Sequence, residues 1–190
     1  MRKNYIIIML VCLGISGLVI FQAKKIPNDD MAPSLLKGDW IWVTSTESKR
    51  GDVVLIRDPH DPNKSLLRRI VGLSPDEVQA NTNGSLRRNG KTLRQREMGT
   101  VDDFKIIQES TWSDDQSPIQ YLIQRNLSAP HTYERESQLL ESNGVYLLAD
   151  NRDVAIDSRW WGPIQKDEIQ GVVWLRIGKG HSWRSWFEKL

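Results

Sequence analysis

The sequence predicts a mostly-β domain behind one N-terminal transmembrane helix, with a polar subdomain inserted into it. Residues 5–22 are uncharged and almost entirely apolar, and about 20 such residues form a helix long enough to cross a bilayer. Short runs of β-branched and aromatic residues follow, as is typical of strands. The clearest of these runs are residues 40–44, 52–57, 66–73, 145–149 and 171–177.

The apolar segment is predicted to be an anchor and not a cleaved secretory signal. Its uncharged run is longer than the roughly 7–15 apolar residues of a secretory signal, and Ala23 alone gives no Ala-x-Ala-like cleavage pattern. Arg2 and Lys3 precede the segment and two lysines follow it. By a small margin, the positive-inside rule favours a cytoplasmic N-terminus. We therefore expect a single-pass protein of the cell (inner, cytoplasmic) membrane with its main domain on the outer side.

The rest of the chain divides by composition. The region after the first strands is polar and contains only short apolar pieces, and its Asn89-Gly90 pair predicts a hairpin turn. This polarity sets the boundaries of an inserted subdomain. The predicted parts are the anchor 1–25, a β core made of 26–77 and 145–178, the inserted subdomain 78–144 and an amphipathic tail 179–190.

Tryptophans suggest where the domain meets other surfaces. In the tail, Trp183, Trp186 and Phe187 have helical spacing, which predicts a short amphipathic helix packed on the domain or lying on a membrane surface. Trp40 and Trp42 alternate with apolar residues in one strand. Either contact with the membrane interface or core packing explains this pair.

Charge and composition exclude several kinds of site. The net charge is +2, but residues 1–25 hold four cations and no acid, which leaves 22 basic and 24 acidic residues in the rest. A nucleic-acid-binding protein needs a strong basic excess on one face, so we expect no nucleic-acid partner. Cys12 is the single cysteine and the three histidines are scattered. These residues do not have the spacing of metal ligands, so no metal site is expected, and no cofactor is expected either.

Three motif-like stretches occur in a fixed order behind the anchor. The first is residues 26–39, Ile-Pro-Asn-Asp-Asp-Met-Ala-Pro-Ser-Leu-Leu-Lys-Gly-Asp. The second is Arg-Gly-Asp-Val-Val at 50–54 with Leu-Arg-Arg-Ile-Val-Gly-Leu at 67–73. The third is residues 149–162, Ala-Asp-Asn-Arg-Asp-Val-Ala-Ile-Asp-Ser-Arg-Trp-Trp-Gly.

Together these stretches resemble the signature of the signal peptidase I (leader peptidase) family, over about residues 5–76 and 145–177. The resemblance implies a membrane-anchored, mostly-β fold whose site faces the lipid surface. It implies that an extended signal peptide adds along a strand edge, with small residues before the cut in shallow pockets. Signal or precursor peptides of exported proteins and membrane lipid are therefore the expected partners.

Four positions depart from the family pattern. Asp30 stands where the family has its nucleophilic serine, and Arg68 stands where it has the lysine that acts as general base. Ala155 replaces a second serine that hydrogen-bonds the lysine, and Asn28 stands where a serine often assists the oxyanion hole. The resemblance is thus closest to catalytically inactive members of the family.

The chemistry of these replacements explains the expected loss of activity. A Ser/Lys pair works only when burial leaves the lysine neutral. The pKa of an arginine side chain is so high that the guanidinium stays protonated in proteins, so Arg68 cannot be that base. Asp30 has no hydroxyl to activate. The two residues have opposite charges, so the sequence predicts a salt bridge in place of the dyad.

Other site positions follow from the same resemblance. Asn28, Ala155, Met31 and Ala32 are expected at the peptide-binding surface, the last two in a strand beside Asp30. Asn28 also fits a simple turn after Pro27. The third stretch is expected to brace the site through an arginine–carboxylate network, although a solvated charged loop is the alternative. The bracing residues would be Asp150, Arg152, Asp153, Asp157, Ser158 and Arg159.

Three functions remain open at this point. The chain is predicted to be a pseudo-peptidase that binds precursor peptides or assists an active signal peptidase. The first alternative is an active peptidase with a non-standard site, for example Asp29 and Asp30 as an acid pair, which Arg68 beside Asp30 would oppose. The second is a scaffold that has lost the peptide groove.

Overall fold

Strands make up nearly all of the regular secondary structure in the described residues, which confirms the mostly-β part of the predicted fold class. The computed structural model describes residues 9–14, 17–81, 85–113, 116–128, 136–178 and 187–189. Its described helices are the four-residue α1 (Ser158–Trp161) and the 3₁₀ turn η1 (Lys166–Glu168). None of the helices in these ranges has the length and apolar character needed to cross a bilayer.

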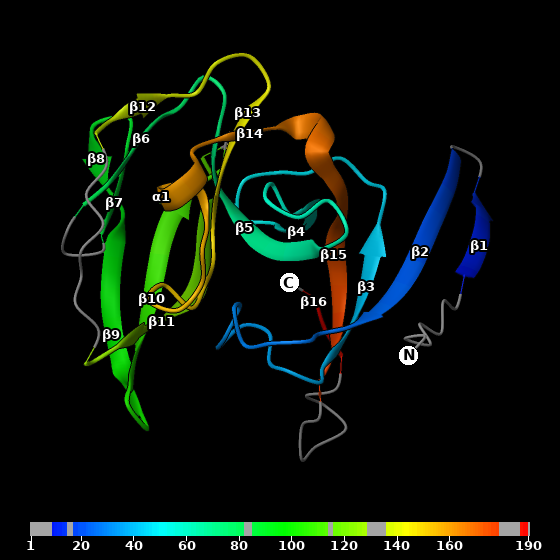
Figure 1. Ribbon diagram of the computed structural model, residues 1–190, viewed down its shortest axis with the longest axis horizontal. Coiled ribbons are helices and arrows are strands. Elements are labelled where there is room, and N and C mark those ends of the chain that lie inside the picture. Colours follow the sequence, from blue (N-terminus) through cyan, green and yellow to red (C-terminus); the bar gives the residue numbers. More distant parts are fainter. Residues whose placement is uncertain are drawn as a thin grey trace.

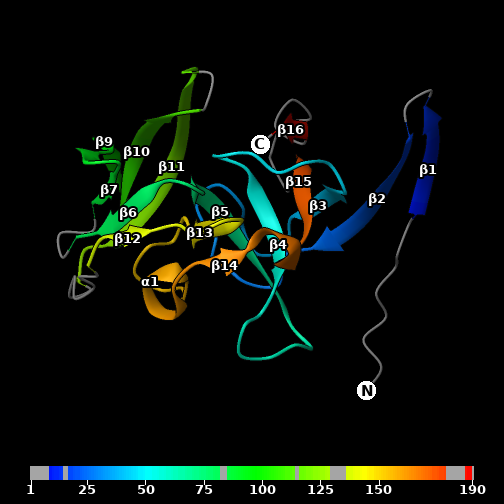
Figure 2. The same cartoon turned by 90° about the horizontal axis from the view of Figure 1, so that it is seen from above.

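The largest sheet has nine strands, and every strand pair in it is antiparallel. It curves around the centre of the molecule, with the β1–β2 hairpin projecting from one end (Figures 1 and 2). In spatial order its strands are β1 (Met9–Gly14), β2 (Gly17–Lys25), β3 (Trp40–Thr44), β15 (Ile169–Ile177), β4 (Val53–Arg57), β5 (Ser65–Leu73), β13 (Gly144–Leu148) and β14 (Ile164–Gln165), with β16 (Phe187–Lys189) paired to β15.

Two smaller sheets lie on the opposite side of the molecule from the β1–β2 hairpin (Figure 1). One has the order β11 (Pro118–Asn126), β10 (Phe104–Trp112), β9 (Arg94–Val101). The other has the order β12 (Gln138–Leu139), β6 (Glu77–Ala80), β7 (Leu86–Arg88), β8 (Lys91–Thr92). We call the first of these the β9–β11 sheet. The boundaries 78–144 of an inserted subdomain remain a prediction. The strands of both small sheets lie between residues 77 and 139.

Local sequence accounts for several of these strands. In β3, Ile41 and Val43 are buried while Trp40 is exposed, as the alternation predicts. Asn89 and Gly90 both have positive φ, 49° and 75°, which is the backbone that a two-residue hairpin turn requires. The expected turn between β7 and β8 is therefore present.

The predicted N-terminal helix is not found where the structure describes this segment. Residues 9–14 and 17–25 form the antiparallel hairpin β1–β2, whose second strand pairs with β3 from Phe21↔Thr44 to Lys25↔Trp40. The second strand contains Val19 and Ile20, whose branched side chains favour strands when a pairing edge is available. Residues 1–8 and 15–16 lie outside the described ranges, and membrane anchoring is taken up below as a proposal.

The predicted tail helix also differs from the structure. Residues 187–189 form the strand β16, which pairs antiparallel with β15 through Leu175↔Lys189, Arg176↔Glu188 and Ile177↔Phe187. Helical spacing of the aromatic residues did not indicate this pairing, because it depends on a strand distant in sequence. Residues 179–186 and Leu190 lie outside the described ranges.

Candidate functional site

Residues 26–39 form a closed loop that carries Asp30 at its surface. The loop is closed by Ile26 and Gly38, since the Ile26 amide donates to the Asp39 carbonyl (2.8 Å) and the Gly38 amide donates to the Ile26 carbonyl (2.9 Å). Met31 and Ala32 lie in a turn of this loop and not in a strand, and both side chains are buried in the core. The polar turn residues before them are thereby held at the surface.

Arg68 lies directly behind Asp30, on β5. Its Nη1 donates to Asp30 Oδ2 (3.1 Å), while Nε and Nη2 both donate to the Ile156 carbonyl oxygen (3.0 and 2.7 Å). The Arg68 side chain is 2% exposed and that of Asp30 is 20% exposed. The guanidinium carbon also lies 6.0 Å from the centre of the Trp161 ring. The predicted salt bridge is therefore present, with the cation inside and the carboxylate at the surface.

Asn151 connects the third stretch to the Asp29-Asp30 turn. Its backbone amide donates to the Asp30 carbonyl (2.9 Å), and its side-chain Nδ2 donates to the Asp29 carbonyl (3.1 Å). Our sequence prediction named the neighbours of Asn151 but not Asn151 itself. Its place between two charged residues in the motif gave no sign that it would hold the turn.

The remaining predicted peptide-binding residues divide between core and surface. Ala155 is buried in the cluster of apolar side chains that also includes Met31 and Leu35, with the partly buried Leu67 packed against it. Asn28 is exposed, and its Oδ1 accepts a long hydrogen bond (3.4 Å) from the Asp30 amide. Asn28 thus has the geometry of the turn residue that we considered, while any contact with a peptide stays a prediction.

The end of the third stretch is held by Asp157. Both carboxylate oxygens of Asp157 accept from the Arg159 guanidinium (2.8 Å each), and Oδ2 also accepts from the Ala149 amide (3.0 Å). Ser158 Oγ accepts from the Leu147 amide (3.0 Å). These contacts are buried, so the loop between β13 and α1 has a fixed path and is not a solvated charged loop.

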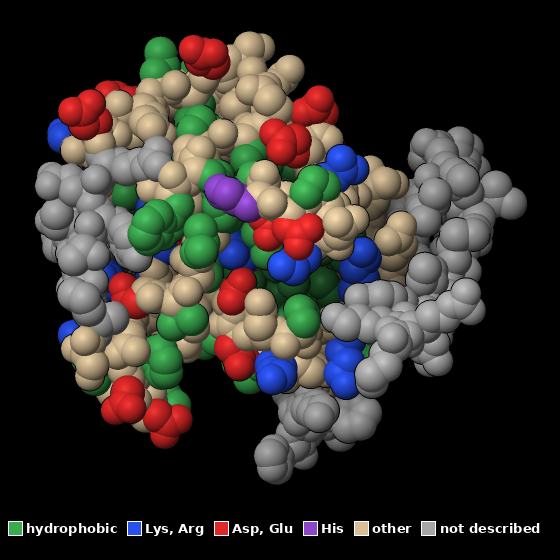
Figure 3. All heavy atoms as spheres, in the orientation of Figure 1, with side chains coloured by type: hydrophobic (Ala, Val, Ile, Leu, Met, Phe, Trp, Pro, Cys, Tyr) green, Lys and Arg blue, Asp and Glu red, His purple; other side chains and the backbone are tan. Residues whose placement is uncertain are grey.

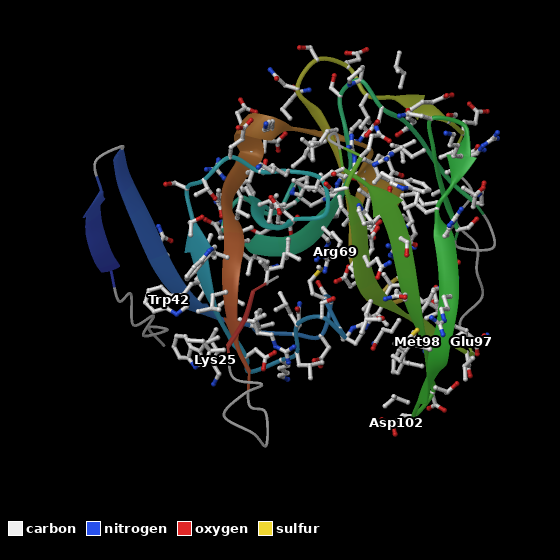
Figure 4. The ribbon with its side chains drawn as sticks, turned by 180° about the vertical axis from the view of Figure 1, so that it is seen from behind. Lys25, Trp42, Arg69, Glu97, Met98 and Asp102 are labelled. Carbon is white, nitrogen blue, oxygen red and sulfur yellow. The ribbon has the colours of Figure 1, made fainter. Side chains whose placement is uncertain are left out.

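The start of the third stretch is held from two directions. Asp150 accepts a bidentate pair of hydrogen bonds from Arg69 (2.8 and 2.6 Å). The Arg69 guanidinium carbon lies 4.5 Å from the centre of the Tyr121 ring on β11, and Arg69 points between the nine-stranded sheet and the β9–β11 sheet (Figure 4). Asp153 accepts from Arg125 Nε and from the Asn126 amide (3.1 and 2.7 Å).

Arg152 is paired with Glu109, which the sequence prediction did not identify. Arg152 Nη2 and Nη1 donate to Glu109 (2.8 and 3.3 Å), and the carboxylate also accepts from the Tyr121 hydroxyl (2.8 Å) and Gln95 Nε2 (3.0 Å). Burial alone would raise the pKa of Glu109, but the Arg152 guanidinium and the hydrogen bonds hold it below its usual range. Burial and the Glu109 carboxylate raise the pKa of Tyr121 well above its usual value, so its hydroxyl stays a donor.

The first and third stretches also carry exposed apolar side chains. On the face of the molecule drawn in Figure 3, hydrophobic and charged side chains lie side by side near the centre. Within the described ranges, no group of histidine, cysteine and acidic residues has an arrangement that could hold a metal ion. The large exposed apolar residues in these stretches are Leu36, Val154, Ile156 and Trp160.

The site can bind and orient charged or polar groups, but the Asp30–Arg68 pair lacks the parts of a serine protease. A guanidinium stays protonated near neutral pH and cannot accept a proton from a nucleophile. A carboxylate paired with it has no hydroxyl to attack a carbonyl carbon. The arrangement therefore offers an ion pair in front of a fixed loop.

Comparison with known proteins gives consistent matches. The family model described as signal peptidase, peptidase S26, matches residues 2–177. Signal peptidase I of Pseudomonas aeruginosa is 25% identical over 209 residues, which cover 97% of this chain and 72% of that protein. Signal peptidase I of Aquifex aeolicus is 27% identical over 213 residues, with 92% and 83% covered. Among solved structures, a signal peptidase I from Enterococcus faecalis V583 is 18% identical and covers 67% of this chain and 97% of that chain, with a TM-score of 0.42.

Proposed function

The chain belongs to the signal peptidase family, peptidase S26, and we propose that it is a membrane-anchored member that binds signal or precursor peptides of exported proteins without cleaving them. The observation behind this proposal is the Asp30–Arg68 ion pair. It occupies the positions at which the sequence motifs align the family's serine and lysine. The pair provides charge and hydrogen bonds but no nucleophile and no neutral base.

The contacts of Arg68 support the non-catalytic part of the proposal. Four hydrogen bonds to Asp30 and to the carbonyls of Leu67 and Ile156 hold the guanidinium. Ala155, where the family has a second serine, is part of the apolar core. Each element of the catalytic arrangement is thus replaced by a group with a structural contact.

An acid-pair mechanism is less well supported by the contacts of the two aspartates. Such a mechanism requires two close carboxylates that share one proton. Here Asp30 Oδ2 accepts from the Arg68 guanidinium, while Asp29 Oδ1 accepts from the Lys37 amide (2.8 Å). Each carboxylate thus has a hydrogen-bond donor of its own, and no contact between these two described side chains supports a shared proton.

We place the protein at the membrane on the basis of its sequence and one surface. Residues 5–22 are long enough and apolar enough to serve as an anchor. Trp40 is exposed on β3 beside Lys25 of β2, and Trp174 is exposed on the neighbouring strand β15; Lys25 and Trp42 lie at the same end of the molecule (Figure 4). Tryptophan and lysine side chains favour the interface between lipid and water. The same position would allow the protein to assist an active signal peptidase.

One experiment tests both halves of the proposal. The detergent-solubilised full chain is incubated with a fluorescent precursor peptide that has a small-x-small site, and anisotropy reports binding while mass spectrometry reports cleavage. We expect saturable binding and no product. A peptide with large residues in place of the small ones is the control and should bind more weakly.

The possible outcomes separate the competing functions. Cleavage that is abolished in Asp30→Ala would show an active, non-standard peptidase and overturn the proposal. Absence of both binding and cleavage would leave only a scaffold. Binding without product, together with faster cleavage when an active signal peptidase is added, would identify the protein as an assisting factor.

A further inference from the structure

Glu109 is a fully buried acid on β10, outside the stretches that define the family. Its side chain is 0% exposed, and its carboxylate accepts four hydrogen bonds, from two nitrogens of Arg152, the Tyr121 hydroxyl and Gln95 Nε2. A carboxylate removed from water is costly unless it is paired and hydrogen-bonded. Both carboxylate oxygens of Glu109 thus accept hydrogen bonds. Half of these bonds come from Arg152, in the loop between β13 and α1, which we call the site loop.

Arg152 links Glu109 to the loop between β13 and α1, to which Arg152 itself belongs. Besides its bonds to Glu109, Arg152 Nε donates to the Ala149 carbonyl (2.9 Å), and the Arg152 carbonyl accepts from Arg159 Nη2 (2.6 Å). The Arg152 amide donates to the Gln124 carbonyl on β11 (3.1 Å). The β9–β11 sheet therefore holds the loop through a main-chain bond and through a buried ion pair.

The loop in turn holds the turn that carries the candidate site. Asn151, which is next to Arg152, forms an isolated bridge with Gln124 and donates two hydrogen bonds to the carbonyls of Asp29 and Asp30. Asn151 and Arg152 share a peptide bond, so the position of one limits the position of the other. The two donors that hold the Asp29-Asp30 turn thus come from a residue next to the buried ion pair.

We propose that Glu109 is a positioning residue for the peptide-binding site. In this view the β9–β11 sheet sets the position of the Asp29-Asp30 turn through Glu109, Arg152 and Asn151. The inference rests on the proposed peptide binding for its functional consequence, but the positional effect stands independently of any ligand.

The test is Glu109→Gln in the full chain, which keeps the shape of the side chain and removes its charge. Hydrogen exchange at residues 28–32 and 149–153 should become about tenfold faster relative to exchange in β4 and β13, which report any general loss of stability. Affinity for the precursor peptide should fall about tenfold, as is typical of a substitution that acts through an intermediate residue. The matched control is Glu97→Gln, an exposed partner of Lys105 (3.0 Å) on the same sheet, which should change neither reading.

Each outcome decides the proposal. Unchanged exchange in both segments of folded Glu109→Gln would overturn it, as would equal acceleration in all strands, which would show only a general loss of stability. If Glu109→Gln does not fold, Tyr121→Phe removes one donor to Glu109 while keeping the charge, and it must give a smaller change in the same two segments. If the wild type binds no precursor peptide, the proposed function fails while the exchange data still decide the role of Glu109.

Discussion

Two carboxylate–arginine pairs lie on either side of the site loop, and they differ in what surrounds the acid. Asp30 is 20% exposed and has one guanidinium contact at 3.1 Å, while Glu109 is 0% exposed and has four donors. Arg68 and Arg152 are equally buried, each 2% exposed. The difference indicates that the Glu109–Arg152 pair supports the structure, whereas Asp30 can still meet a ligand.

The largest expected effect is that of Arg152→Ala. It removes the cation from a fully buried carboxylate and should lower the free energy of unfolding by about 3–5 kcal/mol. Urea denaturation at pH 7 measures this change. Lys105→Ala, which breaks the exposed pair with Glu97, is the control and should cost less than about 1 kcal/mol. Equal costs for the two variants would refute the distinction between buried and exposed pairs.

The second prediction concerns pH. The pKa of folded Glu109 lies below its usual value near 4.5, so its contribution to stability is complete above that pH and is lost as pH falls through the folded-state pKa. The free energy of unfolding of Glu109→Gln should therefore differ most from the wild type near neutral pH, and the gap should narrow as pH falls below 4.5 and through the folded-state pKa. Urea denaturation between pH 7 and pH 3 measures the gap. A gap that stays constant with pH would contradict the ionised, paired state of Glu109.

A smaller effect is expected where the β9–β11 sheet meets the turn at Gly51. Gly51 has φ +91°, and a Cβ there would lie 2.7 Å from Cγ2 of Ile119. Gly51→Ala should destabilise the protein by about 1–3 kcal/mol, because both the backbone and the contact are strained. Gly90→Ala is the control for backbone strain alone, since Gly90 has φ +75° and open space around it. Equal melting temperatures for the two variants would show that the contact with Ile119 contributes nothing.

The smallest effect is expected at the candidate site itself. Asp30→Ala leaves Arg68 with its carbonyl acceptors on Leu67 and Ile156, so the cost should be only about 1 kcal/mol. Glu47→Ala, in an exposed pair with Lys166, is the control. A cost as large as that of Arg152→Ala would mean that Asp30 is a structural residue, and the comparison between the two pairs would fail.

Sequence reasoning identified the site pair because its two halves lie in separate stretches of one recognisable motif. The strands were also accessible, since alternation in β3 and the Asn89-Gly90 pair are local signals. Glu109 was missed although a local signal existed. It lies between Ile107 and Thr111 in β10, and a period of two places all three on one buried face.

The ends of the chain were harder to predict because their structure depends on distant partners. Within the described ranges, the apolar run forms the hairpin β1–β2, whose second strand ends along β3, and residues 187–189 form a strand along β15. An amphipathic or apolar pattern indicates which side chains a segment buries. It does not indicate which edge strand of a sheet is available to pair with that segment. The link through Asn151 was equally inaccessible, since it joins residues more than 120 positions apart.

The planar contact between Arg68 and the Ile156 carbonyl limits which cation can stand at this position. Nε and Nη2 of Arg68 both donate to the same carbonyl oxygen. A lysine ammonium group cannot donate from two nitrogens held in one plane. Exchanging Arg68 for lysine would therefore release the backbone around Ile156 as well as changing the cation that pairs with Asp30. A residue at this position thus has two tasks, of which only one concerns charge.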